Sequence, residues 1–472
     1  MKRQLKQLVV GGVIVSLLAG CTVGPKYRRP IVQPPTAFRG DGDAAAPDPS
    51  SLADLKWFKV FKGEQLQELI RTALVNNYDL RQAVARVNAA RANLGITRSE
   101  QFPNVTANVD MTTLRNSSSG QFALPGGASR DRTFGTVMLN LLSFELDAWG
   151  RLRRATEAAR ADLLATEENR KAVRTTVVSD VASAYFNLLE LDMELETARD
   201  TLATRQESLR LIQARQRGGV ATMLDVRQAE QLVYGAAQTV PDIERLIEQT
   251  ENRINLLLGK APGPVARGRE LTEQEQPPAV PPGLPSSLLE RRPDIRAAEQ
   301  NLIAANAVIG VAKAAYFPRI SLTGLLGFES NQLSSLFTGE TRTWQFVPSG
   351  ALPIFTAGRI KSNVRLAKAQ QQLALTQYEK TIQTAFGEVS DSLVEYHKVK
   401  EIRAQQEALV TTLRDRSRLA YLRYRGGVDT QLNELDADRD LFSAELSLAQ
   451  TRRNELLALV QLYKALGGGW QQ

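Results

Sequence analysis

The sequence is short of the residues on which most catalytic and metal sites depend. Its 472 residues include one cysteine and one histidine, His397. This excludes an internal disulfide framework and leaves no basis for a histidine-based metal centre or catalytic triad. The Gly-Gly pairs lack a preceding strand and a following Lys-Ser or Lys-Thr, so they form no phosphate-binding loop. We therefore expect no enzyme activity, no cofactor and no metal site, and any energy source must lie in a partner protein.

Long apolar runs and a strong charge of one sign are also missing. No apolar stretch reaches the roughly 18 residues of a membrane-spanning helix, which argues against a bundle of such helices. The formal net charge is +8, and part of it belongs to Lys2, Arg3 and Lys6 in a segment that we expect to be removed. The remaining basic residues alternate with acidic ones along helices. This pattern is typical of a solvated helix surface and not of a nucleic-acid-binding face.

The amino terminus has the features of a bacterial lipoprotein signal. A positively charged start is followed by the apolar segment Leu8–Leu18, which is long enough for a signal peptide but too short to span a bilayer. The segment ends in Leu18-Ala19-Gly20-Cys21, which resembles the lipobox that precedes an acylated cysteine. Because Cys21 is the only cysteine of the chain, we expect it to carry the lipid anchor. By resemblance to bacterial sorting rules, Thr22 after the cysteine favours the outer membrane.

Two nearly identical stretches mark the ends of long helical runs. They are Arg217-Gly218-Gly219-Val220 and Arg425-Gly426-Gly427-Val428, 208 residues apart. A Gly pair ends the incoming helix, because glycine adopts the left-handed conformation that closes a helix without a steric penalty. Thr222 and Thr430 can then cap the outgoing helices through their hydroxyl groups. Each stretch is therefore predicted to be the tip of a helical hairpin.

The helical segments come in matching sets. Residues 150–217 and 358–425 form two runs without proline, and their apolar residues follow helical spacing. At 1.5 Å per residue each run would make a rod of roughly 100 Å. The shorter predicted helices are 79–101, 222–258, 294–315 and 430–466. Two shorter helices placed end to end match one long helix in length, and Pro241 is expected to kink or interrupt the helix 222–258.

Two strand pairs separate these helices. The first, 103–147, follows Phe102-Pro103 and begins with alternating apolar and polar residues. The second, 318–355, follows Phe317-Pro318 and shows a similar alternation. Pro348 within its return strand suggests a bulge or bend.

The two halves align, so the chain is read as one duplicated body. Each half runs helix, strand, strand, long helix, tip, helix. The predicted organisation is a signal peptide (1–20), an extended tether (21–62), a first repeat (63–258), a Pro-rich linker (259–287), a second repeat (288–466) and a tail (467–472).

The strand count points to an oligomer. Four strands cannot close a barrel within one chain, whereas three chains supply twelve strands, which can enclose a lumen. The strands suit an outer-membrane barrel in length, while the long helices have the pattern of soluble rods. The predicted fold class is mainly α with a membrane β-barrel: long helical hairpins form a periplasmic α-barrel, and four strands per chain contribute to a trimeric 12-stranded β-barrel.

The sequence resembles the TolC-like outer-membrane efflux family, and within it the NodT-type lipoproteins. The resemblance covers essentially the whole chain. It is carried by the lipobox and Thr22-Val23-Gly24-Pro25, by Arg291-Arg292-Pro293-Asp294-Ile295-Arg296-Ala297-Ala298-Glu299, by Phe317-Pro318-Arg319-Ile320-Ser321-Leu322, by both tips, and by Leu466-Gly467-Gly468-Gly469-Trp470. It implies a homotrimeric, passive, gated conduit that exports drugs or other small toxic compounds. It also implies a proton-driven inner-membrane pump of the resistance-nodulation-division type and a periplasmic adaptor that contacts the tips.

The resemblance also implies a gate at the tips. Tyr424 matches the family's gate tyrosine, which bonds to the neighbouring hairpin, and Asp225 matches the aspartate on that hairpin. Asp436 matches one of two acidic residues in a constriction ring. Asn433 stands where the other acidic residue is expected, and Asp429 where a gate arginine is expected. The alternative is that these residues are ordinary solvated helix ends, which for Asp225 is supported by its place near a helix start.

Three other functions remain open at this point. A periplasmic adaptor is also lipidated, but it carries one hairpin inside β-rich domains. A structural coiled-coil lipoprotein would leave the alternating strand pairs unexplained. A duct for another exporter class, such as metal-ion efflux or type I protein secretion, would have the same architecture; the absence of Met or His clusters argues only weakly against copper.

Overall fold

The computed structural model describes residues 22–36, 38–39, 51–117, 129–274, 283 and 285–470. The predicted signal peptide and Cys21 lie outside the described residues. The chain divides into two compact units. We call Met1–Pro30, Asn88–Ala165 and Ala298–Tyr378 the sheet unit, and Ile31–Val87, Thr166–Ala297 and Glu379–Gln472 the hairpin unit.

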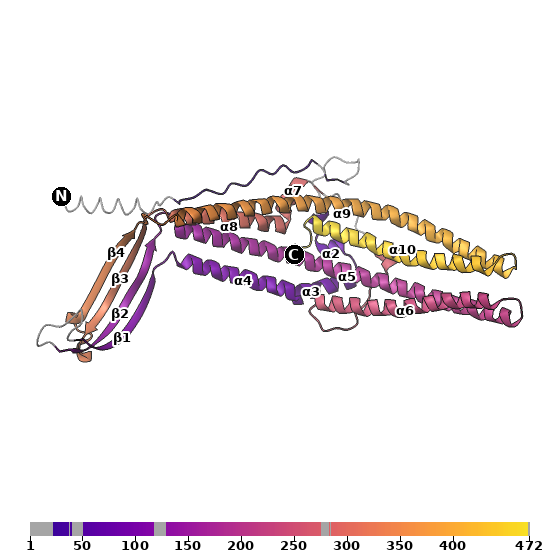
Figure 1. The fold of residues 1–472 in the computed structure, drawn as a ribbon, viewed down its shortest axis with the longest axis horizontal. Coiled ribbons are helices and arrows are strands. Elements are labelled where there is room, and N and C mark those ends of the chain that lie inside the picture. Colours follow the sequence, from indigo (N-terminus) through magenta and orange to yellow (C-terminus); the bar gives the residue numbers. More distant parts are fainter. Residues whose placement is uncertain are drawn as a thin grey trace. The chain divides into compact units, whose positions relative to one another are not determined.

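The element order follows the predicted duplication (Figure 1). The first repeat contains α3 (Glu64–Asn76), α4 (Tyr78–Ser99), β1 (Asn104–Arg115), β2 (Asp131–Leu146), α5 (Arg151–Arg217) and α6 (Met223–Leu257). The second contains α7 (Pro285–Arg291), α8 (Pro293–Ala314), β3 (Arg319–Ser330), β4 (Arg342–Ala351), α9 (Arg359–Arg425) and α10 (Gln431–Ala465). Short elements not predicted from the sequence are η1 (Leu52–Asp54), α2 (Trp57–Val60), α7, η2 (Leu271–Glu273), η3 (Leu333–Ser335) and η4 (Gly339–Thr341).

The helix lengths repeat between the two halves. Both α5 and α9 have 67 residues, and both α6 and α10 have 35. Of the two effects expected of Pro241, the interruption is wrong, because α6 continues through this residue, while the kink stays a prediction. Ala236 and Ile243 are buried on either side of it. Packing on both sides therefore holds the helix together despite the one missing N–H group.

The strands of the sheet unit form one antiparallel sheet in the order β1-β2-β3-β4 (Figure 1). The expectation of a bulge at Pro348 is wrong, since this residue pairs with Leu322 in an unbroken β3–β4 register. β4 is an edge strand, which tolerates a residue without an N–H donor. The register shifts instead between β2 and β3, at Leu141 and Phe144, where the alternation of the sequence is also blurred.

Small and aromatic side chains hold the helices of the sheet unit to each other and to the strand ends. Ala158 and Ala161 of α5 pack against Ala304 and Ala307 of α8, and such small residues let the two helix backbones approach closely. The Trp149 ring stacks on Phe317 with their centroids 4.8 Å apart, and the Trp149 indole donates a hydrogen bond to the Pro318 carbonyl at 2.8 Å. The aromatic pair therefore fixes the turn that leads from β2 into α5 against the start of β3.

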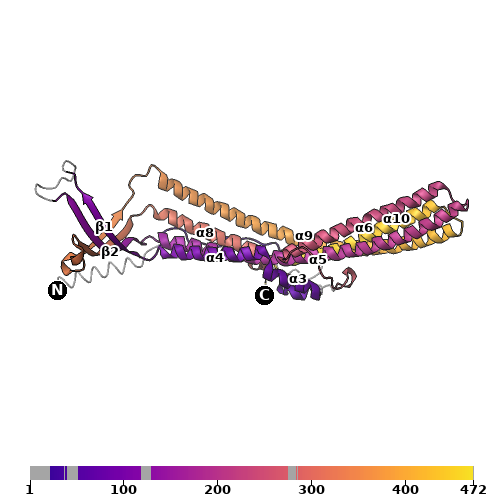
Figure 2. The ribbon, with the colours of Figure 1, turned by 90° about the horizontal axis from the view of Figure 1, so that it is seen from below.

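In the hairpin unit, α6 packs along the C-terminal half of α5 and α10 along the C-terminal half of α9 (Figures 1 and 2). Ile212 of α5 lies in a core with Val226 and Ala229 of α6. Val410 of α9 lies in the corresponding core with Ala444 and Leu448 of α10. Both tips are therefore the ends of antiparallel helix pairs, as the glycine pattern predicts. Within the described residues, none of the helices is both long enough and apolar enough to cross a membrane.

Candidate functional site: the two hairpin tips

The two tips close their helices in the same way. Gly219 and Gly427 have φ values of 73° and 74°. At the first tip the Val220 N–H donates to the Arg215 carbonyl at 2.9 Å, and the Gly219 N–H donates to the Gln216 carbonyl at 3.0 Å. Val428 and Gly427 make the equivalent bonds to Arg423 and Tyr424, both at 3.1 Å. This is the Schellman arrangement, which requires a left-handed residue and so favours glycine at both positions.

The outgoing helices start differently at the two tips. Thr222 forms a capping box with Asp225: the Asp225 N–H donates to the Thr222 hydroxyl oxygen at 3.2 Å, and the Thr222 N–H donates to the Asp225 carboxylate at 2.7 Å. Thr430 occupies the matching position, but its side chain makes no capping hydrogen bond. The prediction of a hydroxyl cap is therefore right for Thr222 and wrong for Thr430.

Asp429 forms the hydrogen bonds that order the residues just before α10 at the second tip. Its carboxylate accepts hydrogen bonds from the Thr430 N–H at 2.8 Å, from the Asn433 amide at 2.6 Å and from the Arg423 guanidinium at 2.9 Å. The bonds from Arg423, Asn433 and Thr430 lower the pKa of Asp429 to about 2. Two predicted gate positions, Asp429 and Asn433, are thus partners of each other.

Tyr424 contacts the other hairpin of the same chain. The Tyr424 side chain is buried, and the guanidinium of Arg215 lies 4.7 Å from its ring centroid. Burial raises the pKa of Tyr424, although the positive charge of Arg215 opposes this shift. A second contact joins the tips nearby, because the Gln431 amide donates to the Asp225 carbonyl at 3.1 Å. Tyr424 and Asp225 therefore belong to one interface between the hairpins.

The Asp225 carboxylate itself is engaged within its own tip. Besides the Thr222 N–H it receives the Thr222 hydroxyl at 2.9 Å. Asp436, the predicted constriction residue, is partly exposed and pairs with Arg439 at 3.2 Å. In the described chain these two carboxylates thus have local partners one turn away.

A buried ion pair between the hairpins was not predicted from the sequence. The guanidinium of Arg205 on α5 lies 2.7 Å from the carboxylate of Asp438 on α10, and it donates a second bond to the Leu232 carbonyl of α6 at 3.1 Å. The Arg205 side chain is 7% exposed. The sequence offers one indication that Arg205 is buried: it lies on the same face of α5 as Ile212, two turns before it.

A second carboxylate lies beside this pair. Glu434 of α10 is buried, and its Oε2 atom has no hydrogen-bond partner among the described residues. Burial and the nearby charge of Asp438 raise the pKa of Glu434 to about 7, against the opposing effect of Arg205. Glu434 is thus poised to change charge near neutral pH, inside the interface between the two hairpins.

A similar buried pair lies further from the tips between the same two helices. Glu190 and Glu194 are one turn apart on α5 and both are buried. Arg453 of α10 lies 3.2 Å from Glu190, and the Gln450 amide donates to Glu194 at 2.9 Å. Burial and the charge of Glu194 raise the pKa of Glu190 to about 8. The α5–α10 contact is therefore rich in buried carboxylates at two separate levels.

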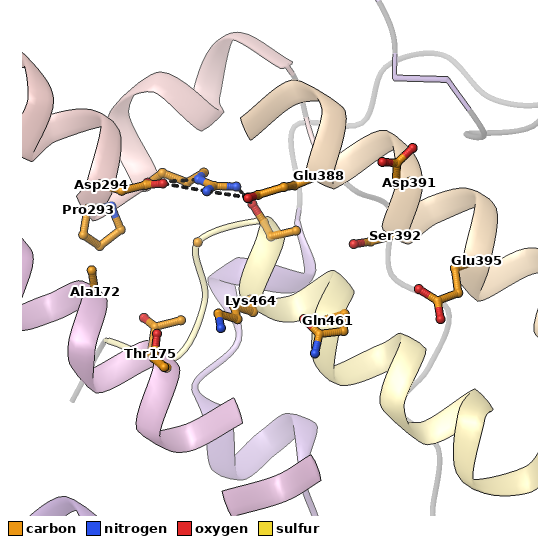
Figure 3. Close-up of a pocket in the computed structure, with 14 residues that line it drawn as sticks. Ala172, Thr175, Pro293, Asp294, Glu388, Asp391, Ser392, Glu395, Gln461 and Lys464 are labelled. Atoms are coloured by element: carbon orange, nitrogen blue, oxygen red, sulfur yellow. Dashed lines mark hydrogen bonds and ion pairs between the residues drawn. The ribbon is translucent and has the colours of Figure 1, made fainter. Parts of the chain in front are cut away.

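The hairpin unit also contains a cavity of about 560 Å³ between α5, α8, α9 and α10 (Figure 3). On its rim the buried Arg292 guanidinium pairs with Asp294 and Glu388, both at 2.6 Å, and donates to the Ala465 carbonyl at 3.0 Å. Through these bonds Arg292 connects α8, α9 and α10. Across the part of the chain that the structure describes, no three His, Cys, Asp or Glu residues are arranged to hold a metal ion.

Comparison with known proteins identifies the family. The model of the family described as "Outer membrane efflux protein" matches residues 69–260 and 284–468. The chain belongs to the outer membrane efflux protein family. Members of this family act as efflux components of the outer membrane, and this is also the location of the present protein.

Relatives match over nearly their whole length. The chain is 40% identical over 476 residues to the "Probable efflux pump outer membrane protein TtgC" of Pseudomonas putida, covering 99% of this chain and 96% of that protein. It is 37% identical to "Outer membrane protein OprJ" of Pseudomonas aeruginosa, covering 98% and 96%.

Solved structures share the fold. The open state of the Neisseria gonorrhoeae MtrE outer membrane channel superimposes with a TM-score of 0.85 at 34% identity, over 96% of this chain and 99% of that one. The Campylobacter jejuni CmeC outer membrane channel gives 0.89 at 26% identity, over 95% of both chains. The duplicated body of helical hairpins and four strands is thus the architecture of outer membrane efflux channels.

Proposed function

We propose that three copies of this outer membrane efflux protein form the passive outer-membrane duct of a tripartite efflux pump. The observation that carries the proposal is the four-stranded antiparallel sheet, in which β1 and β4 are the two edges. An edge strand has unpaired backbone N–H and C=O groups that can pair with a strand of another chain. If β4 of each copy pairs with β1 of the next, three copies close a ring of twelve strands. The hairpins of the three copies then continue the duct into the periplasm.

The substrates are drugs or other small toxic compounds. This is supported by relatives described as a toluene efflux pump outer membrane protein and an antibiotic efflux pump outer membrane protein, each 40% identical to this chain. The protein itself is not an enzyme in this proposal, and a proton-driven inner-membrane pump of the resistance-nodulation-division type supplies the energy.

The partner at the tips is a periplasmic adaptor protein. Val220 and Val428 stand at the ends of the hairpins and are 71% and 67% exposed. Exposed apolar side chains on a rigid, repeated turn are suited to docking another protein. Arg217 and Arg425 flank the glycines and add a polar rim.

A lipid on Cys21 anchors the amino terminus in the outer membrane. Replacing Cys21 with Ala should abolish labelling by radiolabelled palmitate and reduce delivery to the outer membrane, while the channel itself stays competent. Unchanged labelling of the variant would refute the lipid anchor.

The tips form the gate of the duct, with Tyr424 and Asp225 on facing hairpins and Asp429, Asn433 and Asp436 around them. The test is single-channel conductance of the purified protein in a planar bilayer, with its mass in detergent measured alongside. The expected result is a trimer with small, cation-biased openings that widen in the Tyr424→Phe/Asp225→Ala variant. A monomer, or a trimer without conductance in both proteins, would overturn the duct. Conductance that does not change in the variant would remove these two residues from the gate.

A further inference from the structure

The start of α5 carries basic residues that are each neutralised by a nearby acid. These pairs are Arg151 with Glu145 at 2.8 Å, Arg153 with Asp147 at 3.2 Å, and Arg154 with Glu157 at 2.8 Å. All of them lie in the sheet unit, where β2 passes into α5. The connection between strand and helix in the first repeat is therefore close to electrically balanced.

The matching connection in the second repeat, between β4 and α9, does not contain these acids. At the offset of 208 residues that aligns Gly150 with Gly358, the positions of Glu145, Asp147 and Glu157 are taken by Pro353, Phe355 and Arg365. From Arg342 to Tyr378 the chain contains no Asp or Glu at all. The basic residues at the start of α9 thus have no acid of their own segment to balance them.

Three of these basic residues share one side of α9. Lys361, Arg365 and Lys368 follow one another at spacings of four and three, which aligns them along a helix. All three are exposed, and among the described residues none has an acidic partner. Just before the helix, Ile354 and Phe355 are 94% and 88% exposed. We call these five residues the junction surface.

A second copy of the chain does not balance the junction surface. In a closed ring the neighbour of β4 is β1, which is preceded by α4. Within the sheet unit α4 carries Arg91 and Arg98 and no acid, and Glu100 follows it. This stretch therefore brings more positive than negative charge. Negatively charged groups from outside the protein would balance the excess.

We propose that the junction surface binds the phosphate groups of membrane lipids in the leaflet that faces the periplasm. The inference rests on the proposed function, which places the strands in the bilayer and so puts the strand ends at the headgroup level. Clustered Lys and Arg residues next to a membrane-embedded segment attract lipid phosphates, and amphipathic surfaces anchor by burying apolar side chains beside them. Ile354 and Phe355 supply that apolar part, which a free phosphate ion would not need.

The test is native mass spectrometry of the full-length protein in detergent, titrated with phosphatidylglycerol. The variant is Lys361→Gln/Arg365→Gln/Lys368→Gln. Lipid binding should be at least tenfold weaker in the variant, because three headgroup contacts are lost. The matched control, Arg86→Gln/Arg210→Gln/Lys380→Gln, removes the same charge from other exposed positions and should bind lipid as the wild type does.

Three results would overturn the proposal. Binding in the triple variant could equal that of the wild type. Inorganic phosphate could displace the lipid while an Ile354→Ser/Phe355→Ser variant binds lipid normally, which would indicate a site for a free anion. The triple variant could no longer show the mass of a trimer, which would indicate that the junction surface is a contact between copies of the chain. Single-channel conductance tests the proposed duct separately from lipid binding. A protein that binds lipid but shows no conductance would refute only the proposed function.

Discussion

The Arg205 guanidinium and the Asp438 carboxylate, 2.7 Å apart, join the first hairpin of the chain to the second. The Asp438 side chain is 20% exposed and that of Arg205 7%, so the pair is largely shielded from water. The tips of the two repeats are thus tied together by a buried ion pair and by the contact of Arg215 with Tyr424.

Replacing Arg205 with Ala should destabilise the hairpin unit strongly. The change leaves Asp438 and Glu434 without their cation, and breaking a buried ion pair from one side costs about 3 kcal/mol. The helical circular dichroism signal, followed through a denaturant titration, measures the loss. Arg210→Ala, on the exposed side of the same helix, should change stability by less than about 0.5 kcal/mol. Equal midpoints for the two variants would contradict this prediction.

Glu434 should make the stability of the hairpin unit depend on pH. Its pKa is raised from 4.5 to about 7 in the folded protein, so folding favours the protonated form. The resulting stabilisation is fully present below pH 4.5 and is lost as the pH rises through about 7. Glu434→Gln should therefore match the wild type at pH 4 and be more stable at pH 8, as judged by thermal unfolding at each pH. An identical difference at both pH values would show that the charge of Glu434 is not the cause.

Variants of Arg215 and Arg217 form a matched pair that tests whether the contact between the hairpins keeps the gate closed. Arg215 lies over the Tyr424 ring, an interaction worth about 1 kcal/mol, whereas Arg217 is exposed at the end of the helix. Arg215→Gln should raise the open probability of single channels about fivefold, because it loosens the contact between hairpins. Arg217→Gln should leave it unchanged. An equal rise in both variants would indicate a general charge effect at the tip.

Thr222 and Thr430 test the two kinds of helix start. Thr222→Ala removes the capping box of α6, which should cost about 1 kcal/mol locally. Amide hydrogen exchange in the first turn of α6 should become about fivefold faster. Thr430→Ala should leave the first turn of α10 as protected as before, since the Thr430 side chain makes no capping hydrogen bond. Faster exchange in α10 would show that the Thr430 hydroxyl contributes after all.

The periodicity of the sequence predicts the helices and strands well, because each element shows its own repeat of apolar residues. Glycine pairs, Phe-Pro stops and the offset between the halves locate both hairpins and both strand pairs to within a few residues. The expected interruption at Pro241 and the expected bulge at Pro348 do not occur. Packing around α6 and an edge position in the sheet accommodate these two prolines.

Less of the candidate site than of the fold can be predicted from the sequence. The tips and their glycines are predictable because helix closure is local chemistry that needs a left-handed residue. The contacts of Arg205 with Asp438 and of Tyr424 with Arg215 are not predictable in this way, since each joins residues more than 200 positions apart. The sequence by itself determines the duplicated hairpins and strand pairs, because these follow from local spacing. Only the tertiary structure decides which charges are buried together between the hairpins, because burial and pairing depend on how distant helices pack.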